Sequence, residues 1–129
     1  FDTARYMLDN SNSANNKNLS VIKDKRLIEK SYGDYAGVSF AEYGAGLKAG
    51  ETRGLELDNE AADRVEEFFK EKYNEHPDKT ILAVCHGGLM RSFLTQKGIK
   101  EVSRGVIINT SVSVLDYDGE KFTLVEFNK

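Results

Sequence analysis

The sequence contains few of the features that mark secreted, metal-binding or membrane proteins. It has a single cysteine, Cys85, which excludes an internal disulfide and cannot build a cysteine metal site. Its longest apolar runs are far shorter than a bilayer span. No basic, apolar and small-residue pattern of a secretory signal stands at its start. We therefore expect a soluble, cytoplasmic protein that does not associate with membranes.

The chain also lacks an excess of positive charge. Its net charge is -3, its pI is near 5.4, and its 18 basic residues are scattered along the sequence. This distribution gives no reason to expect nucleic acid or an anionic membrane as a partner. With 129 residues, 40% of them hydrophobic, the chain is long enough for one ordinary domain and too short for two.

The stretch from Thr80 to Leu94, TILAVCHGGLMRSFL, joins an apolar run to a glycine turn and a helical pattern. The run Ile81 to Val84 is too short for a globular helix and is typical of a strand buried on both faces of a parallel sheet. The residues that follow have the spacing of the buried face of a helix: Leu89, Met90, Phe93 and Leu94. The pattern predicts strand, tight turn and helix, with His86, Gly87 and Gly88 in the turn.

This predicted turn has the properties of an anion site. The first N–H groups of a helix have no internal partner, and the helix dipole adds partial positive charge at the same place. Gly87 and Gly88 leave the backbone open, and His86 stands at the carboxyl end of the strand, where open α/β sheets place their ligands. Arg91 is a first-turn cation, easier to explain if an anion lies nearby. Each feature alone also has a structural explanation, but their coincidence favours the anion site.

The strongest helical periodicity runs from Leu57 to His76, with Asp58 as the predicted N-cap and Pro77 after the end. Gly98 is predicted to end the helix that begins after His86. Two segments lack a regular pattern. Asn10 to Asn18 is predicted to be a loop, and the glycine-rich stretch from Ser31 to Arg53 is predicted to be a loop or lid beside the substrate. After Gly37, a surface insertion is an equally open alternative.

The remaining apolar segments are typical of strands. Leu19 to Ile22, Val106 to Ile108, Val112 to Tyr117 and Phe122 to Phe127 are strand-like, and Asp118-Gly119 favours a hairpin between the last two. The sequence therefore predicts an α/β fold whose sheet is mostly parallel and ends in an antiparallel pair at one edge.

Two segments resemble motifs of the histidine phosphatase superfamily, which includes phosphoglycerate mutases and many small-metabolite phosphatases. VCHGGLMRSFL, Val84 to Leu94, is similar to the family's second histidine motif. RLIEKSYGDYAG, Arg26 to Gly37, is similar to the segment that carries its acidic proton donor, with Glu29 at the acid. The resemblance implies a three-layer α/β sandwich with helices on both faces of the sheet. Residues 1–129 would be the C-terminal two thirds or so of one such domain, without its first strand.

The resemblance also implies roles for individual residues in phosphoryl transfer through a phosphohistidine. His86 would donate to the phosphoryl group, Gly87 would offer its N–H, Glu29 would be the general acid, and Tyr32 would contact the rest of the substrate. The structural alternatives are a surface carboxylate paired with Lys30 or Arg26, and a tyrosine that only packs. The partner would be a small phosphorylated substrate. No metal or other cofactor is implied, except 2,3-bisphosphoglycerate if the protein is a mutase.

One motif of the family is absent. The sequence has no Arg-His-Gly, which would carry the nucleophilic histidine, and it lacks the family's second catalytic arginine. Thr3-Ala4 matches the end of the pattern that follows a catalytic arginine in the family. We therefore favour an enzyme, a phosphatase or mutase, whose nucleophile lies in a segment before Phe1. This fragment alone would then be inactive. Two alternatives stay open: a complete chain that binds a phosphorylated ligand without catalysis, and an unrelated doubly wound domain.

Overall fold

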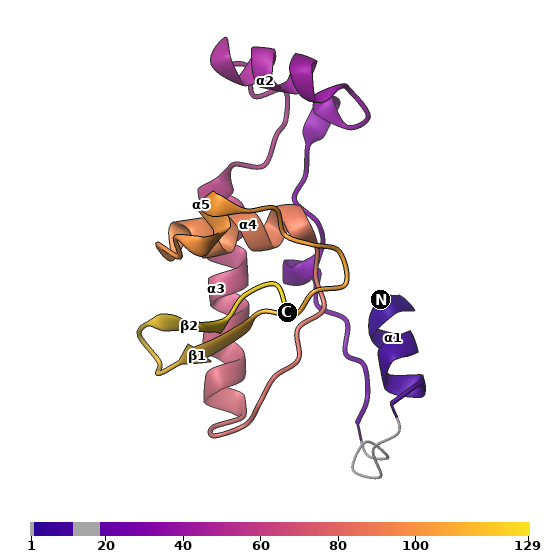
Figure 1. The fold of residues 1–129 in the computed structure, drawn as a ribbon, viewed down its shortest axis with the longest axis vertical. Coiled ribbons are helices and arrows are strands. Elements are labelled where there is room, and N and C mark those ends of the chain that lie inside the picture. Colours follow the sequence, from indigo (N-terminus) through magenta and orange to yellow (C-terminus); the bar gives the residue numbers. More distant parts are fainter. Residues whose placement is uncertain (1, 12–18) are drawn as a thin grey trace.

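The computed structural model describes residues 2–11 and 19–129, so most of the loop predicted for Asn10 to Asn18 lies outside the described residues. Figure 1 shows a long helix, α3 (Asp58–Glu75), at the centre of the molecule, crossed by α4 (Gly87–Gln96). A hairpin of β1 (Val114–Tyr117) and β2 (Phe122–Glu126) lies against the same helix. The core lies where these three parts meet.

Helix α3 forms because its apolar residues recur at helical spacing, and its buried face consists of Ala61, Ala62, Val65 and Phe68. The predicted helix is therefore confirmed within one residue at each end. The prediction that Asp58 is the N-cap is wrong. Asp58 is the first helical residue, Leu57 precedes the helix, and the Leu57 N–H donates to the Glu60 carboxylate at 2.8 Å.

Helix α4 begins after His86, as its pattern predicts, and buries Leu89, Phe93 and Leu94 against α3. Its end is a Schellman motif: the Ile99 N–H donates to the Leu94 carbonyl, and the Gly98 N–H donates to the Thr95 carbonyl, each at 3.0 Å. Gly98 has φ +72, a left-handed conformation that glycine adopts without strain. A short helix, α5 (Glu101–Arg104), follows.

The C-terminal hairpin is confirmed as an antiparallel pair, with Tyr117 opposite Phe122. The rings of these two residues stack at 4.1 Å, and the Phe122 ring packs edge-on to Phe93 of α4 at 5.1 Å. Phe122 also contacts Phe69 of α3, with 5.8 Å between ring centroids. These aromatic contacts fix the hairpin to both helices, because edge-to-face pairs stabilise beyond the area they bury.

The predicted parallel sheet is not confirmed. In the described residues, Ile81 to Val84 is not part of a strand, and neither are Leu19 to Ile22 or Val106 to Ile108. The side chains of Ile81 and Leu82 are 37% and 67% exposed. A strand needs a neighbour for its N–H and C=O groups, and no described segment pairs with this one. The coarse α/β class holds, with helices packed on an antiparallel pair.

The segments before α3 lie outside this core. They comprise α1 (Asp2–Asp9), the 3-10 turns η2 (Lys25–Leu27) and η3 (Gly33–Tyr35), and α2 (Phe40–Lys48). Helix α1 buries no residue, and Figure 1 shows α2 projecting at one end of the long axis. The loop predicted for Ser31 to Arg53 therefore contains a helix, which Ser39 caps by accepting from the Glu42 N–H at 3.2 Å. Within the described ranges, no helix is long and apolar enough to cross a membrane.

Candidate active site

The start of α4 holds an anion, and that anion is the carboxylate of Glu29. Its Oε1 accepts from the Leu89 N–H at 2.9 Å, and its Oε2 lies 3.4 Å from the Gly88 N–H. The Lys30 N–H also donates to Oε1, at 2.8 Å. All three donors are backbone N–H groups, and two of them belong to the first turn of α4. The two segments with motif resemblance therefore meet in space, although 59 residues separate Glu29 from Gly88.

Gly88 has to be a glycine for this contact to form. A Cβ at position 88 would stand 2.4 Å from the Tyr32 hydroxyl oxygen and 2.9 Å from Oε1 of Glu29. A Cβ at Gly87 would meet nothing within 4 Å. The predicted turn thus has one crowded glycine, which lets the carboxylate and the phenol approach, and one open glycine beside them.

Tyr32 is half-buried beside Glu29, and its ring packs edge-on to Tyr43 of α2 with 6.0 Å between centroids. Burial raises the pKa of Tyr32, and the nearby Glu29 charge raises it further. The phenol therefore stays protonated over the physiological range and can act as a hydrogen-bond donor. It links the α4 turn to the helix that projects from the core.

His86 immediately precedes α4 and has extended backbone dihedrals, φ -124 and ψ 155. Its side chain is exposed, and its carbonyl accepts from the Met90 N–H at 3.0 Å. The backbone of His86 is thus part of the helix start while the imidazole is accessible to a ligand. Gly87, the next residue, is also exposed.

The structural alternative for Glu29, an ion pair with Lys30 or Arg26, is not observed. The ammonium of Lys30, a side chain only 7% exposed, pairs with Asp58 at the start of α3. The same Asp58 oxygen accepts from the Ser92 hydroxyl of α4 at 2.7 Å. Burial alone would raise the pKa of Asp58, but hydrogen bonds from Lys30 and Ser92 outweigh it and hold the pKa below its usual value.

The guanidinium of Arg26 is also committed elsewhere. It pairs with Asp24 at 2.7 Å and with Glu71 of α3 at 2.9 Å. The hydrogen bond from Arg26 is the main cause that lowers the pKa of each carboxyl to about 2. These contacts attach the segment before Glu29 to α3 and leave the Glu29 carboxylate to the backbone donors of α4.

Arg91 does not serve the anion site. Its guanidinium donates to the carbonyls of Val102 at 3.2 Å and Gly105 at 3.1 Å, at the end of α5. The expectation that an anion near the turn explains this arginine is therefore wrong. Its position is explained by the helix that follows, whose last carbonyls need donors.

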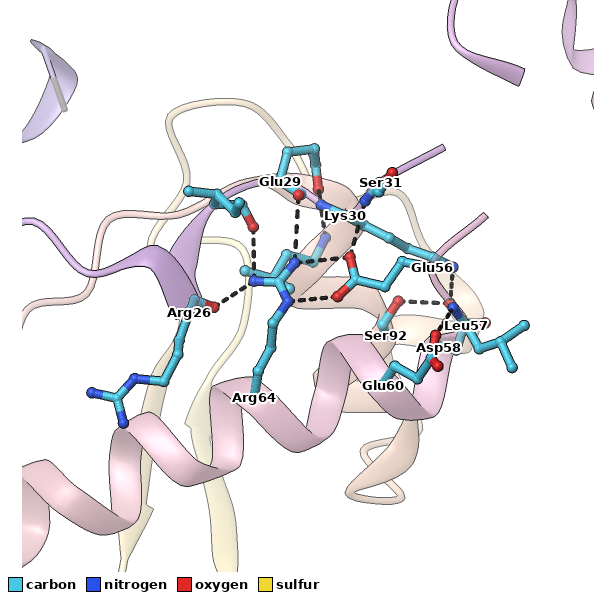
Figure 2. Close-up of polar contacts among 12 residues, drawn as sticks. Arg26, Glu29, Lys30, Ser31, Glu56, Leu57, Asp58, Glu60, Arg64 and Ser92 are labelled. Carbon is cyan, nitrogen blue, oxygen red and sulfur yellow. Dashed lines mark hydrogen bonds and ion pairs between the residues drawn. The ribbon is translucent and has the colours of Figure 1, made fainter. Parts of the chain in front are cut away.

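Sequence reasoning missed Arg64, a residue of α3 that reaches the segment carrying Glu29. Figure 2 shows its guanidinium between the Glu56 carboxylate and the backbone of Arg26 and Glu29. Nothing in the sequence singles it out, since it reads as one of several charges on the exposed face of a helix. An arginine that donates to backbone carbonyls has no partner of a particular residue type, so no motif in the sequence reveals the contact.

No group of His, Cys, Asp and Glu that could hold a metal ion occurs in residues 2–11 and 19–129. Cys85 is half-buried against the core, and burial raises the pKa of its thiol, as for a small apolar residue rather than a nucleophile.

Comparison with known proteins gives one match. The family model of the histidine phosphatase superfamily (branch 1) matches residues 2–129. The search of curated proteins and the search of solved structures return no match.

Proposed function

The chain belongs to the histidine phosphatase superfamily, and on that premise we propose that it transfers the phosphoryl group of a small phosphorylated metabolite through a phosphohistidine. The observation that supports this proposal most is the position of Glu29. Its carboxylate lies within hydrogen-bond distance of the start of α4, next to the exposed His86. A proton donor beside an anion-binding helix start is the arrangement that phosphoryl transfer to and from an oxygen needs.

In this proposal the phosphoryl group lies beside His86 and the N–H of Gly87. Glu29 takes the N–H groups of Gly88 and Leu89, and no described residue accepts from the N–H of Gly87. The imidazole of His86 donates to a phosphoryl oxygen, which neutralises charge in the transition state. Tyr32, beside Glu29, contacts the part of the substrate beyond the phosphate.

The reaction has two steps that use Glu29 in opposite directions. First, an imidazole nitrogen attacks phosphorus, the bond to the ester oxygen breaks, and the Glu29 carboxyl gives its proton to that oxygen. Then the Glu29 carboxylate takes a proton from water as the water oxygen attacks the phosphoimidazole and releases phosphate. The incoming phosphoryl dianion favours the protonated form of Glu29 before the first step, because like charges repel. A mutase would replace the water with a second substrate hydroxyl and would use 2,3-bisphosphoglycerate as its cofactor.

The nucleophilic imidazole belongs, in this proposal, to an Arg-His-Gly segment that precedes Phe1. The same segment would add the parallel strand beside Ile81 to Val84 and complete a three-layer sandwich, of which residues 1–129 form the C-terminal two thirds or so. The exposure of Leu82, an apolar residue in a strand-like run, supports this proposal. Pairing with a new strand would cover it and satisfy its backbone groups.

A second candidate function is binding of a phosphorylated ligand without catalysis. The sequence contains one other histidine, His76, which lies at the end of α3 beside Glu75, and no Arg-His-Gly. The residues gathered at the start of α4 would then hold a phosphate but could not accept the phosphoryl group.

Labelling separates the two functions. The protein from its complete reading frame is incubated with a 32P-labelled phosphate ester and quenched in base, in which phosphohistidine survives. We expect label in the complete protein, none in a protein that starts at Phe1, and a large loss of turnover in His86→Ala. Turnover without a base-stable phosphoprotein would contradict the phosphohistidine route, and unchanged turnover in His86→Ala would contradict the proposed site. Binding of phosphate without turnover would support the second function.

A further inference from the structure

We propose that Arg64 is a positioning residue that holds the backbone around Glu29, so that the Glu29 carboxylate meets both the start of α4 and the ester oxygen. This inference rests on the proposed function, because it concerns the residue placed there as general acid. Arg64 touches neither His86 nor the N–H groups of Gly87 and Gly88. It acts through the segment that carries Glu29.

The contacts of Arg64 use its whole guanidinium. Nη1 donates to the Arg26 carbonyl at 2.5 Å and to the Ile28 carbonyl at 3.0 Å, and Nη2 lies 3.4 Å from the Glu29 carbonyl. Nε and Nη2 donate to the two carboxylate oxygens of Glu56, at 2.6 and 3.0 Å. A guanidinium has five N–H donors in a planar fork, and each of them has an acceptor here.

The segment needs these contacts because little else satisfies it. After the 3-10 turn η2, which ends at Leu27, the chain has no regular structure until η3 begins at Gly33. Carbonyls in such a segment have no neighbours in a helix or strand and must find other donors. One side chain from α3 supplies donors to the carbonyls of Ile28 and Glu29, immediately before and at the acid.

Glu56 holds the backbone on the C-terminal side of Glu29, at Ser31. Its carboxylate accepts from the Ser31 N–H at 2.9 Å, and its own N–H donates to the Ser31 carbonyl at 2.9 Å. The hydrogen bond from Arg64 is the main cause that lowers the pKa of Glu56. Glu56 therefore stays ionised and holds the guanidinium in one orientation. Glu29 lies between two points, Ile28 and Ser31, that the Arg64–Glu56 pair fixes to α3.

This arrangement matters for the chemistry because proton transfer to a leaving group is sensitive to position. A displacement of about 1 Å can cost about 100-fold in rate. Without Arg64, the three hydrogen bonds that join the carbonyls of Arg26, Ile28 and Glu29 to α3 are lost together. The carboxylate would then no longer be held at the Leu89 N–H, where it now lies at 2.9 Å.

Substrates with different leaving groups test this role in the complete protein. p-Nitrophenyl phosphate releases a stable anion that needs no proton, whereas glycerol phosphate releases an alkoxide that does. We expect Arg64→Gln to lower kcat/KM on glycerol phosphate by about 10- to 100-fold more than on p-nitrophenyl phosphate. Glu29→Gln should show the same selectivity, and the double variant should lose little more, because both changes disable one proton transfer.

Arg91→Gln is the matched control. It also removes a guanidinium that donates to two backbone carbonyls, but these belong to Val102 and Gly105 and not to the segment that carries Glu29. It should change turnover of the two substrates by the same factor. Equal losses on both substrates in Arg64→Gln, beside a selective loss in Glu29→Gln, would overturn the positioning role and leave the proposed function standing. No selectivity in Glu29→Gln, or no turnover by the unaltered protein, would overturn the proposed function instead.

A second measurement does not depend on activity. In the complete protein, the amide proton shifts of Gly88 and Leu89 should follow the titration of the Glu29 carboxyl, because these N–H groups donate to it. Arg64→Gln should abolish or strongly reduce that response, and Arg91→Gln should keep it. If Arg64→Gln does not fold, Glu56→Gln removes the anchor of the guanidinium and should weaken the response in the same way. A full response in a folded variant of either kind would overturn the positioning role.

Discussion

The two long helices of the molecule begin in different ways. At the start of α3, the Leu57 N–H donates to Glu60, a residue of the same helix three positions later. At the start of α4, the N–H groups of Gly88 and Leu89 donate to Glu29, which lies 59 and 60 residues away in the sequence. A helix start satisfied by its own sequence is a structural device. One satisfied from a distant segment couples two parts of the molecule and places an ionisable group at a positive helix end.

The carboxylates near these two helix starts also differ in their partners. Asp58 pairs with Lys30, and Glu56 pairs with Arg64, and the hydrogen bonds from these cations help to lower the pKa of each acid. The carboxylate of Glu29 accepts only from backbone N–H groups in the described part of the chain. An adjacent cation favours the ionised form, so a carboxylate beside one is a poor proton donor. The comparison therefore separates Glu29, which backbone N–H groups hold, from two carboxylates that cations hold.

The largest effect on this comparison should come from Gly88→Ala. A Cβ there would stand 2.4 Å from the Tyr32 hydroxyl and 2.9 Å from the Glu29 carboxylate, so both side-chain ends would have to shift. The loss of the Glu29 hydrogen bonds to α4 should then lower the free energy of unfolding by about 1–3 kcal/mol. Gly87→Ala is the matched variant, because its Cβ meets nothing within 4 Å. It should raise the free energy of unfolding by about 0.5–1 kcal/mol, since alanine is the better helix residue. Urea unfolding of both variants measures the difference, and shifts of the same sign would contradict a stabilising contact between Glu29 and the start of α4.

A smaller effect is expected at the start of α3, in the pH dependence of stability. The pKa of folded Asp58 lies below its ordinary value of 3.8, so its contribution is present above that value and is lost as the pH falls through the lowered pKa. Asp58→Asn should remove this part of the acid-induced loss of stability. At pH 7 it should cost about 1 kcal/mol or less, because the Asp58 side chain is largely exposed. The free energy of unfolding of both proteins is measured between pH 7 and pH 2. An equally steep loss in both would contradict a contribution of the ionised Asp58 carboxylate to stability.

The elements that could be predicted are those whose deciding residues lie close together in the sequence. Helical periodicity gives α3, and the Asp118-Gly119 turn between apolar runs gives the hairpin. The resemblance of two short motifs predicts that Glu29 and His86 belong to one site, and the structure has Glu29 at the start of α4, directly after His86. The crowding at Gly88 explains why a glycine is needed there. In each case the residues that decide the structure are close in sequence or belong to one motif.

The features that could not be predicted depend on interactions with residues far away in the sequence. Ile81 to Val84 has the composition of a buried strand, but a strand forms only when a neighbour pairs with it. Asp58 has the residue type of an N-cap, yet its carboxylate is taken by Lys30 from 28 residues away. Arg64 binds backbone carbonyls, which every residue possesses, so no residue type signals its role.

The most direct test of the site is a titration of the complete protein with inorganic phosphate, followed through its backbone amides. If the start of α4 receives a phosphoryl group beside Glu29, the largest shifts should occur at the amides of His86 and Gly87. The amides of Gly88 and Leu89 should move less, because Glu29 already occupies them. Saturable shifts centred on His86 and Gly87 are the predicted result. Unmoved His86 and Gly87 amides at saturating phosphate, or shifts confined to another surface, would contradict the account.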